Sequence, residues 1–151
     1  MKNEFCPYCG EKLSKKYKYI LDDLDVSTLT KIWKEVVLTK SNEINVSNIG
    51  LRQAERLRLT QLRFHALVAK VRNENGSHIP NTWLITKRGA GFLAGEISVP
   101  DYVITFRNKV INHSIERVNR RKFKVLQEFT ATYEIIDGEV MPKRIKQGSM
   151  I

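Results

Sequence analysis

The stretch LRLTQLRFHALVAKVRNENGSHIPNTWLITKRGAGFL, residues 57–93, decides the fold of this chain of 151 residues. Its apolar residues recur at helical spacing, then alternate on either side of a polar segment, and finally return to helical spacing. The pattern predicts the end of a helix, a strand over 67–71, a polar loop over 72–81, a return strand over 83–85 and a helix over 87–94. Thr86 precedes this last helix and is placed to cap it.

Upstream of this stretch the sequence predicts two helical segments. Apolar residues at helical spacing indicate a helix over 28–39, capped by Ser27 or Thr28. A second helical pattern covers 51–66 and leads into the stretch. It forms either one continuous helix or two helices broken near 57–60, and a standard helix-turn-helix requires the break.

Downstream the chain predicts a β-hairpin and a less regular end. Two apolar runs, 102–106 and 110–112, flank the polar residues 107–109, which is a typical hairpin signal. Apolar residues over 115–129 fit a helix loosely, and Asp137-Gly138 indicates a turn. The predicted fold class is therefore α+β.

The positive charge is concentrated. The net charge is +10, and within 51–95 eight Lys and Arg residues face only two acids. A second basic run occupies 120–124, whereas three basic and three acidic residues cancel over 96–118. A localised basic surface attracts polyanions through counterion release. The alternative is that these residues only solubilise one face of the protein.

The two cysteines form the motif Cys6-Pro7-Tyr8-Cys9-Gly10. Cys-Pro-Tyr-Cys is the redox motif of glutaredoxins, in which it follows a strand and opens a helix. Only five residues precede Cys6 here, and Gly10 is a poor opening for a helix. These two facts count against a thiol oxidoreductase.

The same motif, followed by Leu13, resembles one knuckle of a zinc ribbon. This resemblance implies a zinc site at Cys6 and Cys9. Structural zinc takes four ligands, and the two cysteines supply two of them. The sequence leaves three alternatives open: completion by histidines, a site shared across a homodimer, or a knuckle without metal.

The remaining histidines and the tryptophans have simpler interpretations. We expect His65 to be packed and hydrogen-bonded, and His113 to be exposed at the end of the hairpin. Trp33 and Trp83 are expected in the core. No Ser/His/Asp arrangement or phosphate-binding loop is present in the sequence, so we do not expect an enzyme.

The pattern Leu62…Ala66-Leu67-Val68…Trp83-Leu84-Ile85-Thr86-Lys87-Arg88-Gly89…Phe92-Leu93 resembles the winged-helix region of MarR-like and PadR-like regulators. In those families a helix enters the wing, and the return strand ends in a Leu/Ile-Thr-x-x-Gly step that opens the next helix. The likeness covers about 37 residues. The whole layout is also weakly similar to short bacteriophage proteins.

The resemblance implies a recognition helix in the major groove of duplex DNA and a wing on the backbone or minor groove. The recognition positions would be Arg52, Arg56, Arg58, Thr60, Gln61 and Arg63, and the wing positions Arg72, Asn73, Asn75 and His78. Arg pairs well with guanine or phosphate, and Gln and Asn pair with adenine.

Three segments are expected: a cysteine knuckle over 1–20, a winged-helix domain over 21–99, and a hairpin with a C-terminal extension over 100–151 that packs on the core. The expected function is DNA binding without catalysis, as a small transcriptional regulator of phage or prokaryotic origin. The alternative is a protein-interaction module that modulates a host protein. No apolar run approaches the ~20 residues of a membrane span and no signal peptide is visible, so we expect a cytoplasmic location.

Overall fold

Three α-helices and several small antiparallel sheets make up the described chain, which the computed structural model gives for residues 16–127, 129 and 131–143. The helices are α1 (Asp23–Thr39), α2 (Gln53–Phe64) and α3 (Lys87–Ala94), and the 3-10 turns are η1 (Val46–Asn48), η2 (Arg120–Lys122) and η3 (Lys124–Leu126). The strands are β1 (Lys16–Ile20), β2 (Glu43–Asn45), β3 (Val68–Arg72), β4 (His78–Ile85), β5 (Val99–Pro100), β6 (Tyr102–Phe106), β7 (Lys109–His113), β8 (Arg117–Val118), β9 (Tyr133–Ile136) and β10 (Glu139–Pro142). The mixed composition confirms the α+β class at this coarse level.

Helix α1 begins earlier than the sequence predicts. Its N-cap is Asp22, whose carboxylate accepts a hydrogen bond from the Asp25 amide at 2.9 Å, and Asp25 accepts one from the Asp22 amide at 3.0 Å. This reciprocal pair satisfies two amides of the first turn. The predicted cap at Ser27 or Thr28 is therefore wrong, and the Thr28 hydroxyl instead donates to the carbonyl of Leu24 inside the helix.

Strands β2, β3 and β4 form a three-stranded antiparallel sheet in the order β2-β4-β3. In the sequence β2 lies between α1 and α2, and β3 and β4 follow α2. Helix α2 is continuous, so of the two versions predicted for 51–66 the structure has the unbroken one. Strand β4 begins at His78 and not at Trp83, which shortens the predicted ten-residue loop to Asn73–Ser77. Residues 78–81 are exposed, so no hydrophobic alternation announces this part of the strand.

The helix after this sheet forms as predicted. Thr86 is the N-cap of α3: its hydroxyl accepts from the Gly89 amide at 3.0 Å and donates to the carbonyl of Ala66 at 2.6 Å. The cap therefore also joins the start of α3 to the end of α2. At the other end, Gly95 adopts a left-handed conformation with φ of 82°, which L-residues with side chains rarely adopt.

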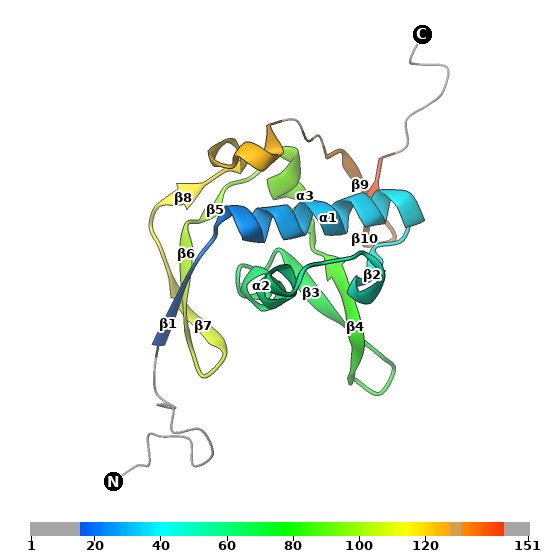
Figure 1. Cartoon of the computed structure of the whole chain (residues 1–151), viewed down its shortest axis with the longest axis horizontal. Helices are drawn as coiled ribbons and strands as arrows, with labels where there is room; N and C mark the ends of the chain where they lie inside the picture. The colour runs from blue at the N-terminus through cyan, green and yellow to red at the C-terminus, as the bar shows by residue number, and fades with distance from the viewer. Residues whose placement is uncertain (1–15, 128, 130, 144–151) are drawn as a thin grey trace.

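A second sheet, in the order β1-β6-β7, lies beside the end of α2. Strands β6 and β7 form the predicted hairpin, and β1 pairs with β6 in register from Lys16↔Phe106 to Ile20↔Tyr102. In Figure 1 the β6–β7 and β3–β4 hairpins extend from the same side of the molecule, with α2 between them. Helix α1 crosses the middle of the view, and η2 and η3 lie on the opposite side.

One hydrophobic cluster joins the described parts of the chain. It includes the predicted core residues Trp33 and Trp83, which are 2% and 7% exposed. It also includes Phe123, Leu126 and Val140 from the C-terminal part. The segment after residue 100 therefore shares the core of the helices and does not form a separate one.

The helix predicted loosely over 115–129 is wrong. The structure has strand β8 there, followed by the turns η2 and η3. The side chain of Arg120 explains this irregular path, since its guanidinium donates to the carbonyls of Leu93, Leu126 and Phe129. These bonds satisfy carbonyl groups of the irregular segment and of the end of α3. The predicted turn at Asp137-Gly138 is confirmed, because it joins β9 to β10.

Within the described residues, none of the helices combines the length and the apolar character needed to cross a bilayer.

Candidate nucleic-acid interface

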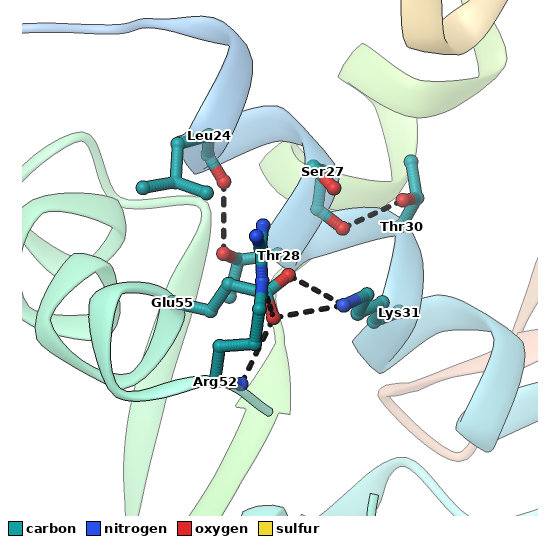
Figure 2. A network of polar contacts seen from close by, with 7 residues as sticks. All are labelled: Leu24, Ser27, Thr28, Thr30, Lys31, Arg52 and Glu55. Carbon is teal, nitrogen blue, oxygen red and sulfur yellow. Dashed lines mark hydrogen bonds and ion pairs between the residues drawn. The ribbon is translucent and has the colours of Figure 1, made fainter. Parts of the chain in front are cut away.

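A buried carboxylate fixes α2 against α1. Glu55 is 0% exposed, and its oxygens bind the Lys31 ammonium of α1 at 2.7 and 2.8 Å (Figure 2). It also accepts from the backbone amide of Arg52 at 3.0 Å and from its guanidinium at 3.2 Å. Burial favours the neutral acid, but the hydrogen bonds from Lys31 and Arg52 outweigh it and lower the pKa of Glu55. The orientation of α2 is thus set by a paired charge at its first turn.

Arg58 provides a second link between these helices. Its guanidinium lies 2.8 Å from the carboxylate of Asp22 and 4.0 Å from that of Asp25, both at the start of α1. The same guanidinium donates to the side-chain oxygen of Gln61 at 2.9 Å. Two residues predicted to touch DNA, Arg58 and Gln61, are therefore engaged on the side of α2 that faces α1.

Asp25 makes this contact between helices sensitive to pH. It is 0% exposed, and burial together with the neighbouring Asp22 charge raises its pKa to about 7. Between the ordinary pKa of an aspartate and this raised value, the folded state binds more protons than the unfolded state, so stability falls as pH rises. We expect the free energy of unfolding to fall between about pH 4 and about pH 7, by up to about 4 kcal/mol for a shift of this size.

The Asp25→Asn variant tests this expectation. An amide oxygen still accepts the Asp22 amide hydrogen bond but does not ionise, so the variant should lose most of the pH dependence. Urea unfolding of both proteins at the two pH values measures the difference. An equal fall in stability in wild type and variant would rule out Asp25 as its source.

The exposed face of α2 points away from α1. It carries Gln53, Arg56, Leu57 and Thr60, all of which are exposed, and Leu57 retains 69% of its accessible surface. A helix of 12 residues is about 18 Å long at 1.5 Å per residue. The major groove of B-DNA, about 12 Å wide, admits such a helix.

A hollow of about 290 Å³ separates α2 from the β3–β4 hairpin. Arg56 lines it from the helix, and Lys70 and His78 line it from the hairpin. The Lys70 ammonium lies 5.6 Å from the centre of the Trp83 ring, which also lines the hollow. Helix and hairpin therefore present basic side chains to a common space.

The tip of the hairpin is built by its own polar residues. The side-chain oxygen of Asn73 accepts from the amides of Asn75 and Ser77 at 3.0 and 3.1 Å, and Arg72 donates to the carbonyl of Gly76 at 2.9 Å. Asn73 is thus occupied in shaping the turn. Arg72, Asn75 and His78 are exposed on it.

Basic residues from two elements, β3 and α2, influence His78. Partial desolvation, followed by the charges of Arg72, Lys70 and Arg63, lowers its pKa, so the neutral imidazole is favoured. Arg63 is the contribution of α2: it is half-buried, with its guanidinium 5.3 Å from the centre of the Phe64 ring. Within the described part of the chain its Nε has no hydrogen-bond partner. The positive potential therefore spans helix and hairpin.

The structure brings together most of the residues predicted for DNA contact and adds two. Arg52 is the N-cap of α2, and Arg56, Thr60 and Arg63 lie on that helix. Arg72, Asn73, Asn75 and His78 lie on the hairpin, whereas Arg58 and Gln61 face α1. The prediction omitted Lys70 and Leu57. Lys70 lies on strand β3, outside the predicted wing loop, and only the packing of the hairpin beside α2 brings it to the hollow. An exposed leucine such as Leu57 gives no signal in a helical pattern.

The metal prediction lies largely outside the described residues, since Cys6 and Cys9 are not among them. Over residues 16–127, 129 and 131–143, no three His, Cys, Asp or Glu side chains gather as a metal site would require. His65 is buried as predicted, with Nε2 donating to the Tyr19 carbonyl at 3.1 Å, and burial lowers its pKa to about 4. His113 is exposed, as predicted.

Comparison of the chain with protein-family models, with curated proteins and with solved structures finds no match.

Proposed function

We propose that this protein is a winged-helix protein that binds duplex DNA, with α2 in the major groove and the β3–β4 hairpin along the phosphate backbone. The observation that carries the proposal is the shared surface of α2 and the hairpin. It presents Arg56, Arg63, Lys70 and Arg72, and the hairpin tip adds one acid, Glu74.

The order of elements supports the winged-helix assignment. Helix α2 runs directly into β3, the hairpin returns through β4, and Thr86 caps α3 as the MarR-like and PadR-like pattern implies. Strand β2 pairs with β4 and completes the sheet. One departure is that the 3-10 turn η1 stands before α2, where those regulators have a second helix.

The exposed side chains suit base contacts by α2 and phosphate contacts by the hairpin. Arg56 is placed to pair with guanine or phosphate, and Leu57 and Thr60 offer apolar contacts to thymine methyl groups. Arg72 and Lys70 carry fixed positive charge for the backbone. The neutral form of His78 favoured by its neighbours still has one N–H donor for a phosphate oxygen.

The salt dependence of binding tests this proposal. With four cations on phosphates, the logarithm of the affinity for random-sequence duplex DNA should fall with the logarithm of salt concentration with a slope of magnitude about 4 or more. Fluorescence anisotropy between about 0.05 and 0.3 M salt measures it. Duplex RNA of the same sequence should bind more weakly, because its narrow major groove does not admit a helix.

Two outcomes would contradict the proposal. One is an absence of binding at the lowest salt concentration. The other is binding that salt does not weaken. Capture of a protein partner in place of DNA would favour the protein-interaction alternative, for which the exposed edge strand β7 is the natural contact.

A further inference from the structure

The β1-β6-β7 sheet is a basic arm. Its three strands and the β6–β7 turn carry Lys16, Lys18, Arg107 and Lys109, and no acidic residue. All four basic residues are exposed. The arm therefore concentrates four positive charges with no compensating charge on its own strands.

The fold creates this concentration by placing the nearby acids elsewhere. Over residues 96–118 the charges cancel in the sequence. In the structure, Asp101 pairs with Lys122 at 2.9 Å, and Glu96 accepts from the Tyr133 hydroxyl at 3.4 Å. Glu116 lies between β7 and β8, beyond the arm.

The arm is fixed to α2. The ring of Tyr19 in β1 stacks on that of Phe64, the last residue of α2, with centroids 5.4 Å apart. The buried His65 follows Phe64 and binds the Tyr19 carbonyl at 3.1 Å. Two contacts at the end of α2 thus set the position of β1, and β1 holds β6 and β7.

The tip of the arm is a tight turn. Arg107 and Asn108 both have positive φ, 52° and 64°, as a two-residue hairpin turn with the twist of its strands requires. This turn holds the side chains of Arg107 and Lys109 at the far end of the hairpin. Figure 1 places that end on the side of the molecule to which the β3–β4 hairpin also extends, with α2 between the two hairpins.

We infer that the basic arm contacts DNA phosphates beyond those reached by α2 and the β3–β4 hairpin, so that the chain covers a longer stretch of duplex on both sides of α2. The inference rests on the proposed function. Charge complementarity selects the occupant: a row of cations without acids beside the proposed DNA surface fits the duplex backbone, which carries one negative charge per about 1.7 Å of its axis.

The test compares two duplex lengths. In the variant Arg107→Gln, Lys109→Gln, affinity for a duplex of about 24 base pairs should fall about 10- to 100-fold at about 0.1 M salt, and the salt slope should shrink by about 2. On a duplex of about 12 base pairs, little more than one helical turn, the effect should be much smaller, since the arm extends beyond the DNA. The variant Lys34→Gln, Arg121→Gln removes the same charge from exposed residues of α1 and η2, outside the arm, and serves as the control.

The outcomes separate the two claims. Binding of the short duplex by the arm variant shows that it is folded. If Arg56→Gln weakens binding to both duplexes while the arm variant binds the long duplex like wild type, the inference is overturned and the proposed function stands. If wild type binds neither duplex, the proposed function itself fails. A salt slope that falls equally on both lengths would also overturn the inference.

Discussion

The variant Arg56→Gln, Arg63→Gln, Arg72→Gln is expected to lose duplex DNA affinity by about 10²–10³-fold at about 0.1 M salt. Each arginine is assigned a phosphate or base contact on α2 or the hairpin, and each lost phosphate contact lowers the salt slope by about 0.9. The slope should therefore shrink by about 3. Glutamine is shorter than arginine and uncharged but keeps an N–H donor at position 72, where the Arg72 guanidinium donates to the carbonyl of Gly76.

A charge-matched control distinguishes a defined surface from general attraction. The variant Lys34→Gln, Arg121→Gln, Lys124→Gln removes the same three charges from exposed residues of α1 and of the segment around η2 and η3. In Figure 1 η2 and η3 lie at the end of the molecule opposite the tips of the two hairpins, and α1 lies between these turns and α2. The control should lose affinity several-fold at most. Equal losses in the two variants would mean that net charge, and not this surface, drives binding.

Replacing Gly89 with alanine is expected to destabilise the fold by about 3 kcal/mol or more. A Cβ at this position would lie 2.2 Å from the carbonyl oxygen of Leu67 and 3.0 Å from Cγ2 of Ile85. The first of these is a backbone atom. The carbonyl of the preceding residue, Ala66, accepts the Thr86 hydroxyl, so the backbone of Leu67 has little freedom to move. Helix α3 would have to separate from β3 and β4. Chemical denaturation measures the change.

Gly91, on the same helix, supplies the matched control. Its added Cβ would meet side-chain atoms of Ile97 and Tyr133 at 3.5–3.6 Å, which is ordinary contact. Alanine also favours a helix by about 1 kcal/mol over glycine. Gly91→Ala should therefore leave stability nearly unchanged or raise it. A Gly89→Ala protein as stable as wild type would show that α3 does not pack as closely as described.

The elements predicted best are those with local signals. Thr86 followed by Gly89 predicts the start of α3, because one hydroxyl caps one helix irrespective of distant residues. The hairpin around residues 107–109 is similarly local. The start of α1 was missed because several residues of its first turns qualify as caps, and only the reciprocal pairing of Asp22 with Asp25 decides between them.

The errors in the candidate site come from tertiary contacts. The winged-helix resemblance placed Arg58 among the recognition residues, whereas in the structure it pairs with Asp22, the N-cap of another helix. Glu55 is buried beside its partner Lys31, which lies 24 positions away in the sequence. The sequence also gives no sign of the basic arm, because the acidic and basic residues over 96–118 are equal in number. Only the structure shows that the acids lie outside the strands of the arm. Periodicity does not carry such information.

The most direct test of the central claim is a residue-by-residue map of the surface that duplex DNA covers. Amide chemical shifts of the ¹⁵N-labelled protein, followed during titration with a duplex, provide that map. Changes should concentrate on α2 and on the β3–β4 hairpin, at and around Arg56, Thr60, Arg72 and His78, and should spare the exposed side of α1. Changes centred on α1 or on η2 and η3, with α2 and the hairpin unaffected, would contradict the account.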